Sequence, residues 1–170
     1  MEGWCFRAHA LTTKYQNYLV KKYSLMTDLY KDNDLYKYIL GLDRSKYHII
    51  GIHIRRGDYK FWENGKYNFT DDTYQLYMDN FSIELKKRSD KEINFILFSN
   101  ENITINTAGD KVVSNNEWYI DQLIMSKCDY LIGPPSTFTL WASFIGKVKY
   151  YHITDNKGQI DIDKFSCCRG

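Results

Sequence analysis

The chain has 170 residues, of which 44% are hydrophobic and 26% are charged, so its composition excludes a disordered protein and allows one packed domain. Its 23 basic and 21 acidic side chains leave a formal charge of +2, which gives no support to a nucleic-acid partner. No apolar run reaches the roughly 18 residues of a membrane span, so neither a signal peptide nor a transmembrane segment is expected. The four cysteines form no Cys-x-x-Cys pair, which favours a reducing, cytoplasmic location, with peripheral attachment to a membrane left open.

Residues 1–45 are predicted to form a mainly helical lead-in segment. Apolar side chains recur with a mainly helical period over residues 8–30. A second, short helix is expected over residues 34–40, where Gly41 ends it. This part of the chain contains no recognisable chemistry.

Residues 46–153 alternate between strand and helix patterns and are followed by a polar tail, residues 154–170. The expected strands are residues 47–54, 93–98, 112–113, 129–133 and 147–153, and the expected helices are residues 71–87, 117–127 and 136–144. This alternation predicts an α/β domain: a Rossmann-like parallel sheet with helices on both faces.

Four polar side chains follow the first strand of this domain: His53, Arg55, Arg56 and Asp58. Ligands of open α/β sheets bind at the carboxyl ends of the strands. Arginine forks suit phosphate, and a buried arginine pair needs an anion. The motif therefore predicts a site for a phosphate or diphosphate group.

Other interpretations of the same residues remain open. His53 could be a core histidine with a satisfied hydrogen bond, and Asp58 could simply pair with Arg56. Arg56-Gly57-Asp58 also spells an adhesion tripeptide, but its position directly after an apolar strand disfavours that role.

Two further loops are expected at the same edge of the sheet. One begins with Ser99 after the strand at 93–98. The other carries Ser136 and Thr137 at the start of a helix, where free N–H groups and a positive dipole end favour phosphate. Ser136 could instead be only a helix N-cap. No acidic cluster suggests a metal, so arginine and backbone N–H groups would neutralise a bound diphosphate.

Three segments resemble GDP-fucose-dependent fucosyltransferases. His53-Ile-Arg-Arg-Gly-Asp58 matches their His-x-Arg-Arg-x-Asp motif and looks most like the α1,2-fucosyltransferase family. Residues 121–138 resemble a later motif of the same superfamily, and residues 98–101 resemble its Phe-Ser-Asp-Asp element. The resemblance covers residues 47–153 and implies the C-terminal, donor-binding half of a GT-B glycosyltransferase.

The resemblance also implies roles for individual residues. Arg55 would hold the β-phosphate and assist catalysis, while Arg56 would organise the loop or contact the donor. Glu63 lies ten positions after the motif histidine, where the α1,6 relatives have a base, although it could equally be a solvated loop carboxylate. The implied donor-binding set is His53, Arg55, Arg56, Asp58, Ser99, Asp121, Ser136 and Thr137, with His53 and Asp121 at the guanine end.

The implied reaction transfers L-fucose from GDP-β-L-fucose to a sugar hydroxyl, with galactose O2 as the expected acceptor position. It would proceed with inversion and without metal or cofactor, and its partners would be GDP-fucose and an oligosaccharide or glycan. The alternative is a non-catalytic GDP- or nucleotide-sugar-binding module or an inactive fragment, because a GT-B enzyme has a second Rossmann-like domain for which this chain has no room.

Overall fold

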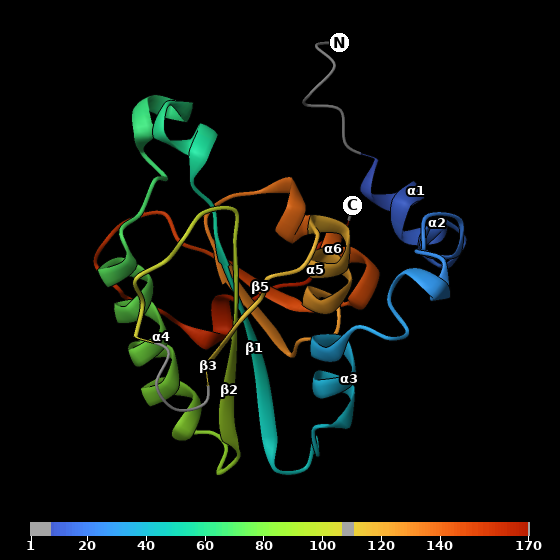
Figure 1. Ribbon diagram of the computed structural model, residues 1–170. Helices are drawn as coiled ribbons and strands as arrows, with labels where there is room; N and C mark the ends of the chain where they lie inside the picture. The colour runs from blue at the N-terminus through green and yellow to red at the C-terminus, as the bar shows by residue number, and fades with distance from the viewer. Residues whose placement is uncertain (1–7, 107–110, 170) are drawn as a thin grey trace.

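The computed structural model describes residues 8–106 and 111–169 (Figure 1). Its centre is a parallel five-stranded sheet in the order β3-β2-β1-β4-β5. The strands are β1 (Tyr47–Ile54), β2 (Glu92–Ser99), β3 (Lys111–Val113), β4 (Tyr130–Gly133) and β5 (Lys149–His152). The parallel sheet predicted from the sequence is thus confirmed.

Helices cover both faces of this sheet, as Figure 1 shows. On one face lies α4 (Asp71–Lys86), and on the other lie α3 (Asp34–Gly41), α5 (Trp118–Met125) and α6 (Thr137–Gly146). Alternate side chains of β1 supply the two cores: Ile50 packs with the α4 residues, and Ile49 packs with the residues of α3 and α5. The strand is apolar throughout because both of its faces are buried.

The longest helix, α4, buries the apolar stripe that its sequence predicts. Tyr74, Tyr77 and Phe81 are each at most 1% exposed. Thr70 is the N-cap, and its hydroxyl accepts a hydrogen bond from the Thr73 N–H at 3.3 Å. Asp71 is therefore free to turn its carboxylate toward another part of the molecule.

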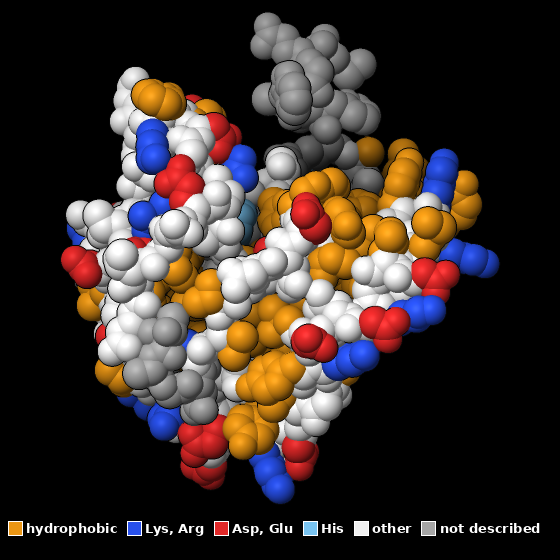
Figure 2. Space-filling view, in the orientation of Figure 1, with side chains coloured by type: hydrophobic (Ala, Val, Ile, Leu, Met, Phe, Trp, Pro, Cys, Tyr) orange, Lys and Arg blue, Asp and Glu red, His pale blue; other side chains and the backbone are white. Residues whose placement is uncertain are grey.

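The first segment differs from the single helical pattern expected over residues 8–30. Two short helices, α1 (His9–Lys14) and α2 (Gln16–Lys22), meet at Tyr15, and a 3-10 turn follows at Thr27–Leu29. The backbone of Tyr15 (φ −101°, ψ 13°) departs from helical values, so the two helices are separated by a local distortion, although Tyr15 still donates to the Leu11 carbonyl and accepts from the Leu19 N–H. Neither helix buries a residue, and hydrophobic side chains gather over them in Figure 2.

No helix in the part of the chain that the structure describes has the length and apolar character needed to cross a membrane.

The strand order reverses between β1 and β4, which are neighbours in the sheet but far apart in sequence. Gly133 ends β4 beside His53, and a Cβ atom at Gly133 would lie 2.6 Å from the His53 carbonyl oxygen. Only glycine allows this close approach of the two strands. In open α/β sheets, ligands bind in the crevice at such a reversal, so a binding site is expected at the carboxyl ends of β1 and β4.

Candidate active site

His53 lies buried at the end of β1 and is tied to α6. Its Nδ1 atom is 2.9 Å from the Thr139 hydroxyl oxygen, and its ring lies 5.2 Å from that of Phe138. Burial lowers the pKa of His53 to about 3, with smaller contributions from the charges of Arg55 and His152. The imidazole is therefore neutral at pH 7, and one of its nitrogens already has a protein partner.

Arg55 is the accessible arginine of the pair. Its side chain is 36% exposed, and its terminal nitrogen lies 2.9 Å from a carboxylate oxygen of Asp58. Its guanidinium carbon lies 5.7 Å from the ring centroid of Tyr59. The interpretation that Asp58 pairs with Arg56 is wrong, because Asp58 pairs with Arg55. Several N–H donors of Arg55 remain available to a ligand.

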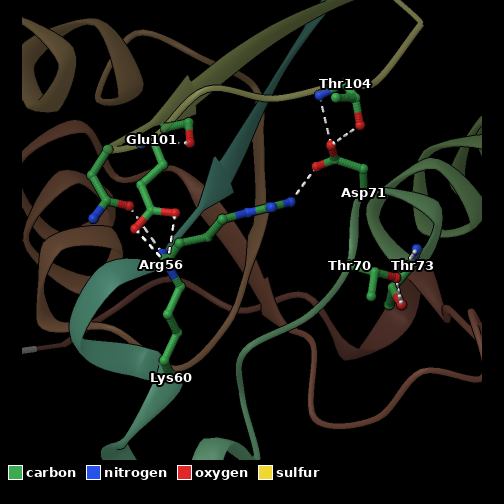
Figure 3. A network of polar contacts seen from close by, with 9 residues as sticks. Arg56, Lys60, Thr70, Asp71, Thr73, Glu101 and Thr104 are labelled. Carbon is green, nitrogen blue, oxygen red and sulfur yellow. Dashed lines mark hydrogen bonds and ion pairs between the residues drawn. The ribbon is translucent and has the colours of Figure 1, made fainter.

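Arg56 points the other way and joins separate loops (Figure 3). Its guanidinium pairs with Asp71, whose second oxygen accepts hydrogen bonds from the Thr104 N–H at 2.6 Å and hydroxyl at 2.5 Å. The Arg56 backbone N–H donates to the Asn100 side chain at 2.9 Å. Arg56 thus links the loops after β1 and β2 to the start of α4. Between the two suggested roles, this geometry matches the organising one.

A cavity of about 290 Å³ opens at the carboxyl ends of β1 and β2 beside α5. We call it the Asp121 cavity. It brings together four of the residues singled out from the sequence: His53, Arg55, Ser99 and Asp121. These residues come from three separate segments, so their convergence is a consequence of the strand order.

Asp121 places a carboxylate in the wall of this cavity. The residue is 7% exposed, and it accepts a hydrogen bond from the Ser114 hydroxyl. Burial raises the pKa of Asp121 to about 6, although hydrogen bonds from Ser114 and Asn116 oppose the rise. The group is mostly ionised at pH 7 and is suited to accept hydrogen bonds from N–H groups of a ligand.

Ser136 and Thr137 lie at the start of α6 but do not line the Asp121 cavity. They line a larger groove of about 940 Å³ on the other side of the β4–α6 junction. Ser136 is also the N-cap, since its hydroxyl accepts a hydrogen bond from the Phe138 N–H at 3.2 Å. Ser136 therefore both caps α6 and lines the groove.

Glu63, the suggested base, lies apart from these residues. It is exposed in the 3-10 turn Trp62–Gly65, with a positive φ of 50°, and lines neither the Asp121 cavity nor the groove. Its catalytic role stays a prediction. Asp129 of the second motif lies at the opposite end of the sheet, where it accepts the Ile49 N–H at 2.7 Å and pairs with Arg44.

Several residues near the site were not identified from the sequence. Trp118 is 66% exposed and lines the Asp121 cavity together with Asn116. Its spacing of three residues from Asp121 on one helix was the available signal. No comparable signal connects Arg56 with Asp71, because loop conformation brings them together.

Among residues 8–106 and 111–169, no group of three or more histidine, cysteine or acidic side chains could hold a metal ion.

A parallel α/β sheet with an accessible arginine, a buried carboxylate and a helix N-terminus at its reversal point is typical of nucleotide-binding enzymes. The sequence profile of glycosyl transferase family 11 matches residues 12–159, which is most of the chain. The chain belongs to glycosyl transferase family 11. No curated protein matches it.

The structure is also similar to solved fucosyltransferase chains. A NodZ α1,6-fucosyltransferase soaked with GDP-fucose is 20% identical, with a TM-score of 0.42, over 71% of this chain and 44% of that one. NodZ from Bradyrhizobium is 18% identical, with a TM-score of 0.43 and the same coverage. NodZ co-crystallised with GDP is 17% identical, with a TM-score of 0.47, over 87% of this chain and 46% of that one. The chain therefore spans less than half the length of these proteins.

Proposed function

We propose that this chain is the donor-binding part of a fucosyltransferase that takes L-fucose from GDP-β-L-fucose. Membership of glycosyl transferase family 11 supports glycosyl transfer. The observation that carries the proposal is the joint presence of Arg55 and Asp121 in one cavity at the strand reversal. A cation and an anion on the same cavity match a ligand with a diphosphate at one end and N–H donors at the other.

The donor would lie along the carboxyl edge of the sheet. The Asp121 carboxylate would accept hydrogen bonds from guanine N–H groups, with His53 beside it. Arg55 would bind the β-phosphate, and the first N–H groups of α6 would face the diphosphate from the other side of the β4–α6 junction. Asp58 would orient Arg55 through their ion pair, and Ser99 would line the cavity.

Departure of GDP develops negative charge on the diphosphate. Arg55 and the α6 N–H groups are held in position before reaction, so they stabilise this charge more in the transition state than in the ground state. Attack by a sugar hydroxyl would invert the anomeric centre. We propose galactose O2 as the acceptor position, Glu63 as the base, and a reaction without metal or cofactor.

A second function is GDP-sugar binding without transfer. It is favoured by the position of Glu63, the suggested base, because this residue lines neither the Asp121 cavity nor the groove beside α6.

Calorimetry with GDP and GDP-fucose, together with a transfer assay on a β-galactoside, tests the proposal. Arg55→Ala is expected to lower transfer at least ~100-fold, since it removes preorganised charge stabilisation. Arg88→Ala is the control, because Arg88 pairs with Asp163 on the surface away from the site. Near-native turnover of Arg55→Ala would refute the assignment of Arg55.

The same assays on the wild-type protein distinguish fucosyl transfer from GDP-sugar binding without transfer. Binding of both ligands with transfer supports the enzyme, and binding without transfer supports the module. If neither GDP nor GDP-fucose binds, both proposals fail.

A further inference from the structure

The groove of about 940 Å³ beside α6 extends beyond the helix start that would face the diphosphate, to Tyr59, Trp62 and His152. We call it the Trp62 groove. Its lining includes the aromatic rings of Tyr59 and Trp62, from the loop after β1, and the hydroxyls of Ser136 and Thr137 at the start of α6. Its volume is more than enough for a small-molecule ligand, for which pockets of about 300–1,000 Å³ are usual.

The aromatic rings of the groove are held in position by several contacts. Trp62 packs in tilted pairs with Tyr59 and Tyr67, with ring centroids 4.9 Å and 5.2 Å away, respectively. The Tyr59 hydroxyl donates a hydrogen bond to the Pro135 carbonyl, so the loop is tied to the β4–α6 junction. Trp62 nevertheless keeps 43% of its surface exposed, which leaves part of the ring available to a ligand.

The remaining wall supplies hydrogen-bonding groups. Ser136 and Thr137 carry hydroxyls, and His152 comes from the end of β5. The His152 Nε2 atom is buried and has no hydrogen-bond partner among the residues that the structure describes. Burial lowers the pKa of His152 to about 4, so the ring is neutral at pH 7.

Aromatic rings together with hydroxyl and imidazole groups in one groove match a sugar ring. The C–H face of a pyranose packs on an aromatic ring, and the hydroxyls around its edge need hydrogen-bond donors and acceptors. A nucleobase would also stack, but among the described residues no carboxylate side chain lines the groove to accept its N–H groups. A lipid chain would leave the polar wall unsatisfied.

Arg55 connects this groove with the Asp121 cavity. It lines that cavity, and its guanidinium lies over Tyr59, which belongs to the groove. We propose that the Trp62 groove is a pyranose-binding subsite, in which Trp62 is the stacking platform. This inference rests on the proposed function, because a diphosphate held at Arg55 would place a sugar ring at this end. The ring is either the fucosyl group of the donor or the acceptor sugar.

Saturation-transfer NMR with methyl α-L-fucoside and methyl β-D-galactoside on the nucleotide-free chain tests the groove directly. Wild-type protein is expected to give a signal with at least one sugar, and Trp62→Ala is expected to weaken it at least ~fivefold. Phe61→Ala is the matched control, because Phe61 is the adjacent aromatic residue, is 84% exposed and does not line the groove. The Phe61 variant should bind sugar like the wild type.

Calorimetry then shows whether the groove binds the fucosyl group of the donor or the acceptor sugar. If the groove holds the fucosyl group, Trp62→Ala lowers affinity for GDP-fucose but leaves affinity for GDP unchanged. If it holds the acceptor, the variant loses only methyl β-D-galactoside binding. Equal sugar binding by wild type and Trp62→Ala, or no sugar binding by the wild type, would overturn the inference. Sugar binding without any GDP binding would instead refute the proposed function, while the pyranose-binding role of the Trp62 groove would remain supported.

Discussion

Arg55 and Arg56 are adjacent and chemically identical, yet the structure gives them different surroundings. Successive side chains of an extended backbone point in opposite directions, so one arginine reaches the cavity and the other reaches Asp71. Arg55 keeps an accessible guanidinium beside Asp58, while the side chain of Arg56 is mostly buried. The pair therefore combines one residue that lines the Asp121 cavity with one that links the loops to α4.

Asp121 should link stability with function in a pH-dependent way. Its folded pKa of about 6 lies above the ordinary value of 3.8, so the folded state binds the proton more tightly. This contribution to stability is present in full below pH ~4 and is lost as pH rises through 6. Asp121→Asn removes the titration and should stabilise the protein at pH 8 by up to roughly 3 kcal/mol. Urea unfolding at pH 8 and pH 4 checks this, and the gain should nearly vanish at pH 4.

The same variant should lose affinity for GDP, since an amide cannot accept hydrogen bonds with both of its heteroatoms. Asp79→Asn, an exposed change on α4, provides the control for a general effect of charge. A variant that is no more stable at pH 8 than the wild type would contradict the burial of an ionised Asp121.

At the scale of elements, the site depends on loops that are tied together rather than on strands alone. Asp71 at the start of α4 binds Arg56 from the first loop and Thr104 from the second. Lys60 and Glu101 add a second, exposed ion pair between the same loops. These contacts hold the loops after β1 and β2, which line the Asp121 cavity, against the start of α4.

Removing Asp71 should destabilise the protein and loosen both loops. Asp71→Ala leaves the largely buried Arg56 guanidinium without its ion-pair partner, which should cost roughly 2–4 kcal/mol in urea unfolding. Asp163→Ala is the matched control, because it breaks an ion pair with Arg88 that is mainly exposed. If both variants shift the unfolding midpoint equally, the Arg56–Asp71 pair has no special structural role.

At the scale of the molecule, the close approach of β1 and β4 creates the crevice. Gly133→Ala would place a Cβ atom 2.6 Å from the His53 carbonyl oxygen and 2.9 Å from the His53 Cβ atom. The strands would have to separate, so we expect a loss of at least ~2 kcal/mol in thermal or urea unfolding and weaker GDP binding.

Gly41→Ala tests the same substitution at an open position. No heavy atom lies within 4 Å of a Cβ atom there, and the residue belongs to α3. It should be neutral or stabilising by roughly 0.5–1 kcal/mol, because alanine favours helix. Similar losses from both variants would contradict a specific role for Gly133.

Sequence patterns predicted helices and strands best where the apolar pattern is long and polar or capping residues mark both of its ends. The strand at 47–54 has the predicted bounds because its apolar run stops at charged residues on the site side. The stripe of α4 was equally clear. The pattern over residues 8–30 predicted helix correctly but not its division at Tyr15, because α1 and α2 bury no residue and their apolar spacing alone does not define where each helix ends.

Local periodicity and residue type were enough to predict the parallel α/β sheet, the strand followed by Arg55, and the polar loops at the edge of the sheet. They did not predict that Arg55 faces the cavity while Arg56 faces Asp71, or that the start of α6 lines a separate groove with Trp62. Such contacts depend on strand order and loop conformation, which join residues that no local pattern connects.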